Sequence, residues 1–138
     1  KLHIILIQPI KNVLFIKISV FFCYFCTEKS HFMKNLTLEE FQIYCLLMAA
    51  EADFDITKQD LIAMGSKSDP VTFVRVYNGF EADNDIARKN TISECKALYI
   101  NDELDRHNLF DGMRRTFFFD GRFKAAEVSV FKTLREVI

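Results

Sequence analysis

From residue 36 to the end of the chain, apolar residues recur with the spacing of an α-helix. One such stripe, at positions i, i+3, i+4 and i+7, is Phe41, Tyr44, Cys45 and Met48. No alternating strand pattern of useful length interrupts the helical spacing, and four glycines and two prolines provide few turns for a many-stranded sheet. The sequence therefore predicts an all-α fold, and 138 residues suffice for one packed core.

Capping signals divide this body into about six helices. Thr37 with Glu40, and Thr57 with Asp60, have the spacing of a capping box at a helix start. We expect the second helix to carry Leu61, Ile62 and Met64 inward and to end at Gly65 in a left-handed conformation.

The later helices begin at equally clear signals. Pro70 suits the first turn of a third helix that Asn78-Gly79 would close, and Asp83-Asn84-Asp85 would cap the fourth. A fifth helix is expected from Asn101-Asp102-Glu103 to about Phe119, and a last one from about Lys124. The expected buried stripes of the fourth and last helices are Ile92, Cys95, Leu98 and Tyr99, and Val128, Phe131 and Leu134.

A repeat at an offset of 67 residues aligns residues 53–61 with residues 120–128 without gaps. Each copy has an acid at a helix exit, an apolar residue three positions later (Ile56, Phe123) and an acid seven positions later (Asp60, Glu127). We expect the apolar residue to staple the turn to the core and the second acid to satisfy the next helix's first N–H groups. Two such helical hairpins predict a pseudo-symmetric bundle.

These turns resemble those of the TerB-like family, the helical domains named for tellurite-resistance proteins. The family shows an Ala-Asp-Gly turn and an acid at the start of the following helix, in both halves. The matching residues, within a resemblance that covers roughly residues 36–138, are Ala52, Asp53, Asp60, Asp120, Gly121 and Glu127. The first copy departs from the pattern because Phe54 stands where the family often has Gly, which would leave the polar role to Asp55.

The resemblance implies a divalent-cation site at these turns and a role in tellurite or related stress responses. Carboxylates are the hard oxygen donors that Ca²⁺ or Mg²⁺ takes. The candidate metal ligands are Asp53, Asp55, Asp60, Asp120 and Glu127. An EF-hand is excluded, because Met64 or Ile62 would fall at the position that requires a bidentate Glu. The alternative is a structural or protein-interaction adaptor whose acids only cap helices.

Catalytic motifs for phosphate, zinc-protease or serine-hydrolase chemistry are missing from the sequence, so we expect a non-catalytic domain. Cys45 and Cys95 fall on apolar stripes, where a thiol stays protonated. His107 has Asp111 four residues on, within reach on one helix face. An enzyme with an unrecognised helical site remains a third possibility. Its mark would be a closed pocket with a desolvated acid or histidine.

Charge indicates the kind of partner. The net charge is −1, which argues against a nucleic-acid partner. A small basic cluster near the second acidic turn is either a solvated face or a contact for an acidic protein partner; it comprises Arg114, Arg115, Arg122 and Lys124.

Residues 1–32 differ from the remainder. They hold four basic residues and one acid, which leaves 14 basic and 18 acidic residues in 33–138. They also lack Met, and Met33 precedes the first helix signal, so we expect residues 1–32 to be an upstream read-through and the functional domain to be 33–138.

A membrane anchor at Val13–Phe25 ranks second, since 13 residues fall short of the roughly 20 that a spanning helix needs. An additional strand or helix ranks third. Cys23 and Cys26 lack a second pair at zinc-site spacing, and the cysteine pattern favours a reducing, cytoplasmic location.

Overall fold

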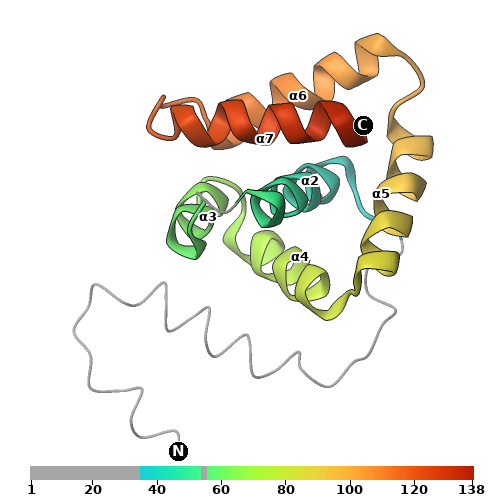
Figure 1. Ribbon diagram of the computed structural model, residues 1–138, viewed down its shortest axis with the longest axis horizontal. Helices are drawn as coiled ribbons and strands as arrows, with labels where there is room; N and C mark the ends of the chain where they lie inside the picture. Colours follow the sequence, from blue (N-terminus) through green and yellow to red (C-terminus); the bar gives the residue numbers. More distant parts are fainter. Residues whose placement is uncertain (1–34, 54–55) are drawn as a thin grey trace, which may run out of the picture.

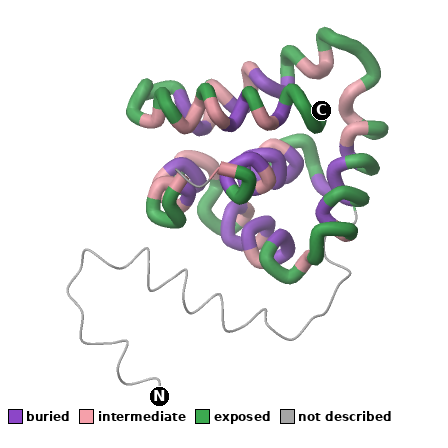
Figure 2. The backbone as a smooth tube through the Cα atoms, in the orientation of Figure 1, coloured by how far each residue is buried: buried purple, intermediate pink, exposed green. Residues whose placement is uncertain are grey.

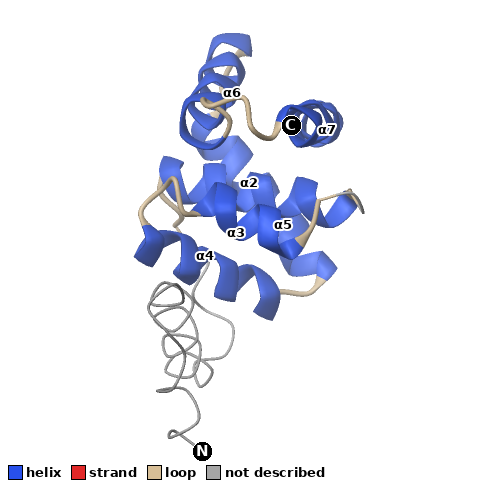
Figure 3. Cartoon of the chain, turned by 90° about the vertical axis from the view of Figure 1, so that its left-hand side faces the viewer, coloured by secondary structure: helices blue, strands red, loops and turns tan. Residues whose placement is uncertain are grey.

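The computed structural model describes residues 35–53 and 56–138, and every regular element in those ranges is an α-helix (Figures 1 and 3). The helices are, in chain order, α2 (Leu38–Ala52), α3 (Lys58–Gly65), α4 (Pro70–Ala82), α5 (Asp85–Tyr99), α6 (Glu103–Phe117) and α7 (Lys124–Val137). The predicted all-α bundle of about six helices is confirmed, whereas the pseudo-symmetry of its two halves stays a prediction.

Residues 1–32 lie outside the described residues, and so do the hypotheses made about them and about the pair Cys23 and Cys26. The candidate ligand Asp55 also lies outside the described residues. None of the described helices combines the length and the hydropathy that a membrane span requires.

Side chains cap the helix starts as the sequence predicts. In both capping boxes the threonine hydroxyl accepts the N–H of the acid, at 3.3 Å for Thr37–Glu40 and 3.1 Å for Thr57–Asp60, while the acid accepts the threonine N–H. The next three helices begin after N-cap residues whose side chains also accept a backbone N–H: Asp69, Asn84 and Asp102.

Helix α2 is buried on every side, not on one stripe as predicted (Figure 2). Met48, which the prediction placed in the stripe, is only partly buried. The buried residues of α2 are Glu40, Phe41, Ile43, Tyr44, Cys45, Leu46, Leu47, Ala49 and Ala50. The prediction was too narrow because it followed one face of a helix whose other faces are equally apolar. Such a helix must be enclosed by its neighbours.

The other helices form that enclosure. Helices α6 and α7 lie on one side of α2 and α4 lies on the opposite side, in both Figure 1 and Figure 3. Helix α5 joins the two layers at one end, and α3 lies at the other end (Figure 1). Each of the five packs against α2, and the most extensive helix–helix contacts all involve α2. One core therefore runs along this helix.

The five helices that surround α2 are called the shell helices below. Three details predicted for them are wrong. Helix α4 continues past Asn78-Gly79 to Ala82, because Phe80 is needed in the core, where it is 3 % exposed. Leu98 is exposed because the inward stripe of α5 passes through Ile92, Cys95 and Tyr99, one position away. Val128 is 70 % exposed because α7 faces the core with Val130, Phe131 and Leu134.

Gly65 does not adopt the predicted left-handed conformation. It is the last residue of α3, and the glycine with positive φ among the described residues is Gly121, at +68°. Gly65 serves close packing instead: a Cβ atom there would lie 2.1 Å from Cε2 of Phe73, whose ring is buried. The absent side chain lets α3 approach α4.

We therefore expect Gly65→Ala to lower the free energy of unfolding by about 1–3 kcal/mol, because a buried ring must move to admit the methyl group. Helix propensity alone predicts the opposite sign, a gain of about 1 kcal/mol. Urea unfolding of Gly65→Ala, alone and combined with Phe73→Ala, distinguishes the two effects. A stabilised Gly65→Ala variant, or an equal loss in the Phe73→Ala background, would contradict the packing role.

Candidate functional site

The first acidic turn lies between α2 and α3. Asp53 caps the end of α2, where its backbone N–H donates to the carbonyl of Ala50 at 3.3 Å. Asp60 lies in the first turn of α3 and accepts hydrogen bonds from the hydroxyl of Thr57 at 2.6 Å and from its N–H at 3.2 Å. These two bonds lower the pKa of Asp60 below its usual value of 3.8. Asp60 thus performs the predicted capping role.

The second acidic turn, between α6 and α7, holds a lysine from another part of the chain. Lys67, in the loop after α3, donates to Oδ2 of Asp120 at 2.7 Å and to the carbonyl of Phe117 at 3.1 Å. Its ammonium group also lies 5.1 Å from the ring centres of Phe119 and Phe123. The Lys67 hydrogen bond is the largest cause of a lowered pKa at Asp120. An internal cation thus neutralises this carboxylate.

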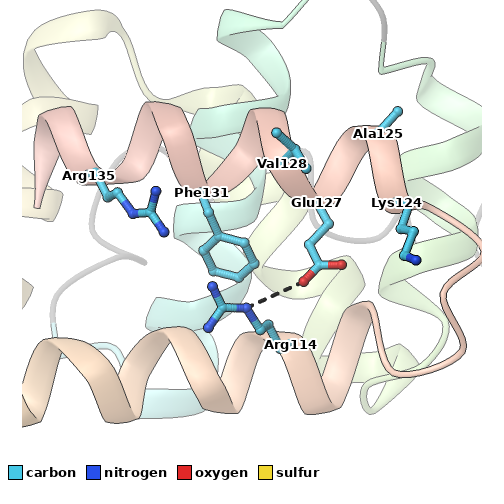
Figure 4. Close-up of a pocket in the computed structure, with 7 residues that line it drawn as sticks. All are labelled: Arg114, Lys124, Ala125, Glu127, Val128, Phe131 and Arg135. Carbon is cyan, nitrogen blue, oxygen red and sulfur yellow. Dashed lines mark ion pairs between the residues drawn. The ribbon is translucent and has the colours of Figure 1, made fainter.

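The last candidate ligand, Glu127, does not cap α7 as predicted. The N-cap residue of α7 is Phe123, and no side chain caps this helix, although Glu127 does lie in its first turn. The carboxylate turns toward α6, where its Oε1 lies 3.4 Å from Nε of Arg114 (Figure 4). The staple role of Phe123 and Ile56 is confirmed, since both are partly buried against the core.

The two acidic turns lie at the same end of the bundle. Lys67 reaches from the end of α3 to Asp120, and Arg122 contributes to lowering the pKa of Asp60. Over residues 35–53 and 56–138, however, no three acidic, histidine or cysteine side chains converge in a way that could hold a metal ion. Metal binding by the five carboxylates therefore stays a prediction.

A polar network that the sequence analysis missed joins α2, α4 and α5. Arg88 is 9 % exposed and places one guanidinium nitrogen 2.6 Å from each carboxylate oxygen of Glu51. Its Nε donates to the carbonyl of Phe80 at 3.1 Å, and its guanidinium lies 4.0 Å from the Phe80 ring centre. Arg88 thus fixes the corner between α4 and α5 against the end of α2.

Asp83 belongs to the same corner. The sequence predicts that it caps α5 together with its neighbours, but Asn84 alone supplies the capping side chain. Asp83 instead accepts a hydrogen bond from the hydroxyl of Tyr44 at 2.9 Å, and burial raises the pKa of Tyr44 well above its usual range. The carboxylate therefore accepts a hydrogen bond from a hydroxyl on the fully buried Tyr44 of α2.

The two described thiols are buried, as predicted. Burial raises the pKa of Cys45 well above its usual value and that of Cys95 to about 11, so both are protonated at neutral pH. Neither thiol is placed to act as a nucleophile.

His107 makes the predicted contact with Asp111. Its Nε2 lies 3.3 Å from Oδ2 of Asp111, and its side chain is 66 % exposed.

A groove of about 500 Å³ lies between α6 and α7 (Figure 4). Its lining is basic and apolar, with one acid: Arg114, Lys124, Ala125, Glu127, Val128, Phe131 and Arg135. Two members of the predicted basic cluster, Arg114 and Lys124, belong to it. The sequence did not indicate Arg135 or Val128 as lining residues, because only the packing of α7 decides which side of the helix faces the groove.

No protein-family model, curated protein or solved structure matches the chain. The resemblance to the TerB-like family therefore stays a prediction.

The lowered pKa of Asp60 gives a pH-dependence with a definite sign. Because the folded protein favours the carboxylate, the stabilisation is complete above a pH of about 3.8 and is lost as the pH falls through the lower pKa of the folded state. We expect Asp60→Asn to reduce the difference in free energy of unfolding between pH 6 and pH 2.5, measured with urea. Glu136→Gln, an exposed change in the last turn of α7, is the control. An unchanged pH-dependence in Asp60→Asn would show that the cap is not formed.

Proposed function

We propose that the body of this chain is a non-catalytic, TerB-like protein-interaction module whose acidic turns stabilise its own fold. The observation that carries the proposal is that Asp60, Asp120 and Glu127 each bind a partner within the chain. Those partners are Thr57, Lys67 and Arg114 respectively. The carboxylates that a cation site would use already have structural roles.

Electrostatics supports the same proposal. A divalent ion at Asp120 would have to displace an ammonium group that lies 2.7 Å away and is itself only 15 % exposed at its side chain. Displacing Lys67 would remove a charge-assisted hydrogen bond and leave its ammonium group among the rings of Phe119 and Phe123. At Asp60, an ion would compete with two hydrogen bonds of the α3 capping box.

A divalent-cation site for Ca²⁺ or Mg²⁺, linked to tellurite or related stress responses, is the second candidate. One observation favours it: the two acidic turns lie at the same end of the molecule, and the pKa values of Asp60 and Asp120 are lowered. Both carboxylates are therefore ionised at neutral pH, as ligation requires.

Calorimetric titration of the full chain with Ca²⁺, Mg²⁺ and Mn²⁺ separates the two candidates. We expect no heat beyond that of dilution and an unchanged melting temperature, because the carboxylates keep their internal partners. The matched variant Lys67→Met leaves Asp120 without its ammonium partner and tests whether Lys67 is what keeps an ion out. Saturable heat with the unaltered chain, abolished by Asp120→Asn, would establish the cation site and overturn the adaptor proposal.

A further inference from the structure

Charge is distributed unevenly over the body of the chain. Residues 114–135 hold six basic and two acidic residues, whereas the remainder of 33–138 holds eight basic and sixteen acidic ones. The basic segment covers the end of α6, the following turn and most of α7. A positive region on an otherwise acidic domain favours a negatively charged partner at this place.

The groove between α6 and α7 lies within this basic segment. Lys124 and Arg135 are at its two ends along α7, and both side chains are exposed (Figure 4). Neither forms an ion pair with a described residue. They are eleven positions apart in the sequence, which is about 16 Å along a helix, or three turns. Two unneutralised cations thus mark the ends of the groove.

The middle of the groove is apolar and fixed. Val128 is 70 % exposed there, and Phe131 forms the floor with its ring buried. The guanidinium of Arg114 stacks on that ring at 4.5 Å and is held by Glu127 and by Asp111, 3.3 Å away. Arg114 is therefore an ordered part of the wall, and Val128 is an aliphatic side chain with nothing described covering it.

We propose that this groove docks an amphipathic helix of a partner protein that carries acidic residues about three turns apart and aliphatic residues between them. The proposal rests on the interaction function proposed above and names its surface and partner. The acids would meet Lys124 and Arg135, and the aliphatic side chains would cover Val128 and the edge of Phe131. Docking would bury the apolar strip and neutralise both free cations.

A helix fits this surface better than an extended polyanion does. The groove is about 16 Å long between its cations, and the rest of the domain is acid-rich. A nucleic acid longer than the groove would extend over a domain whose other residues include eight basic and sixteen acidic ones, and it would offer no aliphatic side chain to Val128. A short acidic helix avoids both costs.

Fluorescence anisotropy with the full chain tests the proposal. The probe is a labelled synthetic peptide of fifteen residues that forms a helix, with glutamates near both ends and leucines on one face between them. Its control is a scrambled peptide of the same composition. We expect the amphipathic peptide to bind and the scrambled peptide to bind at least tenfold more weakly, because only the former presents both chemistries on one face.

Two double charge reversals supply the matched protein variants. Lys124→Glu/Arg135→Glu removes both groove cations and should weaken binding at least tenfold. Lys89→Glu/Lys132→Glu makes the same change in net charge at exposed positions on α5 and α7 outside the groove lining, and should leave binding within twofold. Val128→Asp, an exposed substitution, should weaken binding as the groove reversal does, and circular dichroism checks that each variant is folded.

Several outcomes would overturn the proposal. These are no binding of the amphipathic peptide, equal binding of the scrambled peptide, equal weakening by both double reversals, or groove-dependent binding of a single-stranded oligonucleotide or of anionic phospholipid vesicles in place of the peptide. Each of these leaves the cation titration unchanged, because that experiment reports on the carboxylates of Asp60 and Asp120, neither of which lines the groove. Failure of the groove and failure of the adaptor function are therefore distinguishable.

Discussion

Helix α2 is apolar around its whole circumference, and the other helices are arranged to remove it from water. The four consecutive residues 43–46 are all fully buried, and successive residues of an α-helix point about 100° apart, so every face is covered. No single neighbour could cover all of these faces, because one helix–helix contact hides only one stripe. The five shell helices need only one apolar stripe each, which leaves their outer faces free for charge. The charged outer surface of the domain, including the α6–α7 groove, is therefore formed by the outer faces of the shell helices.

Charged side chains then fix the shell helices relative to the centre. Buried Arg88 ties the start of α5 to Glu51 at the end of α2, and Arg75 of α4 pairs with Glu40 near the start of α2. Lys67 joins the end of α3 to Asp120 in the α6–α7 turn. Partners of this kind orient helices whose apolar contacts alone permit sliding. The Lys67 pair also occupies Asp120, one of the carboxylates predicted as cation ligands.

The sequence predicts local features of this fold well. The helix starts at Thr37 and Thr57 could be located because a capping box is formed by residues three apart. The contact of Lys67 with Asp120 spans 53 residues, and that of Arg88 with Glu51 spans 37, so only the packed structure brings these groups together. The acidic turns are therefore recognisable in sequence, whereas Lys67, the base that neutralises Asp120, is not.

The same reasoning explains why the sequence predicts the wrong buried residues on α5 and α7. Leu98 and Val128 fit a helical stripe by spacing, but a stripe shifted by one residue fits nearly as well, and the neighbours of α5 and α7 decide between them. The consequence is functional, because the misplaced Val128 became part of the groove. The residue type of Gly65 correctly predicts the end of α3 but wrongly predicts a left-handed conformation, because its close approach to Phe73 in the next helix cannot be seen in the sequence.

The central place of α2 is tested most directly by native-state hydrogen exchange. We predict that the amides of residues 43–49 exchange only through global unfolding, with a free energy equal to that from urea denaturation, and that those of α3 exchange through smaller local openings. Exchange of the α2 amides at a free energy below that of the shell helices would contradict the account, since a helix enclosed on all sides cannot open before its enclosure does.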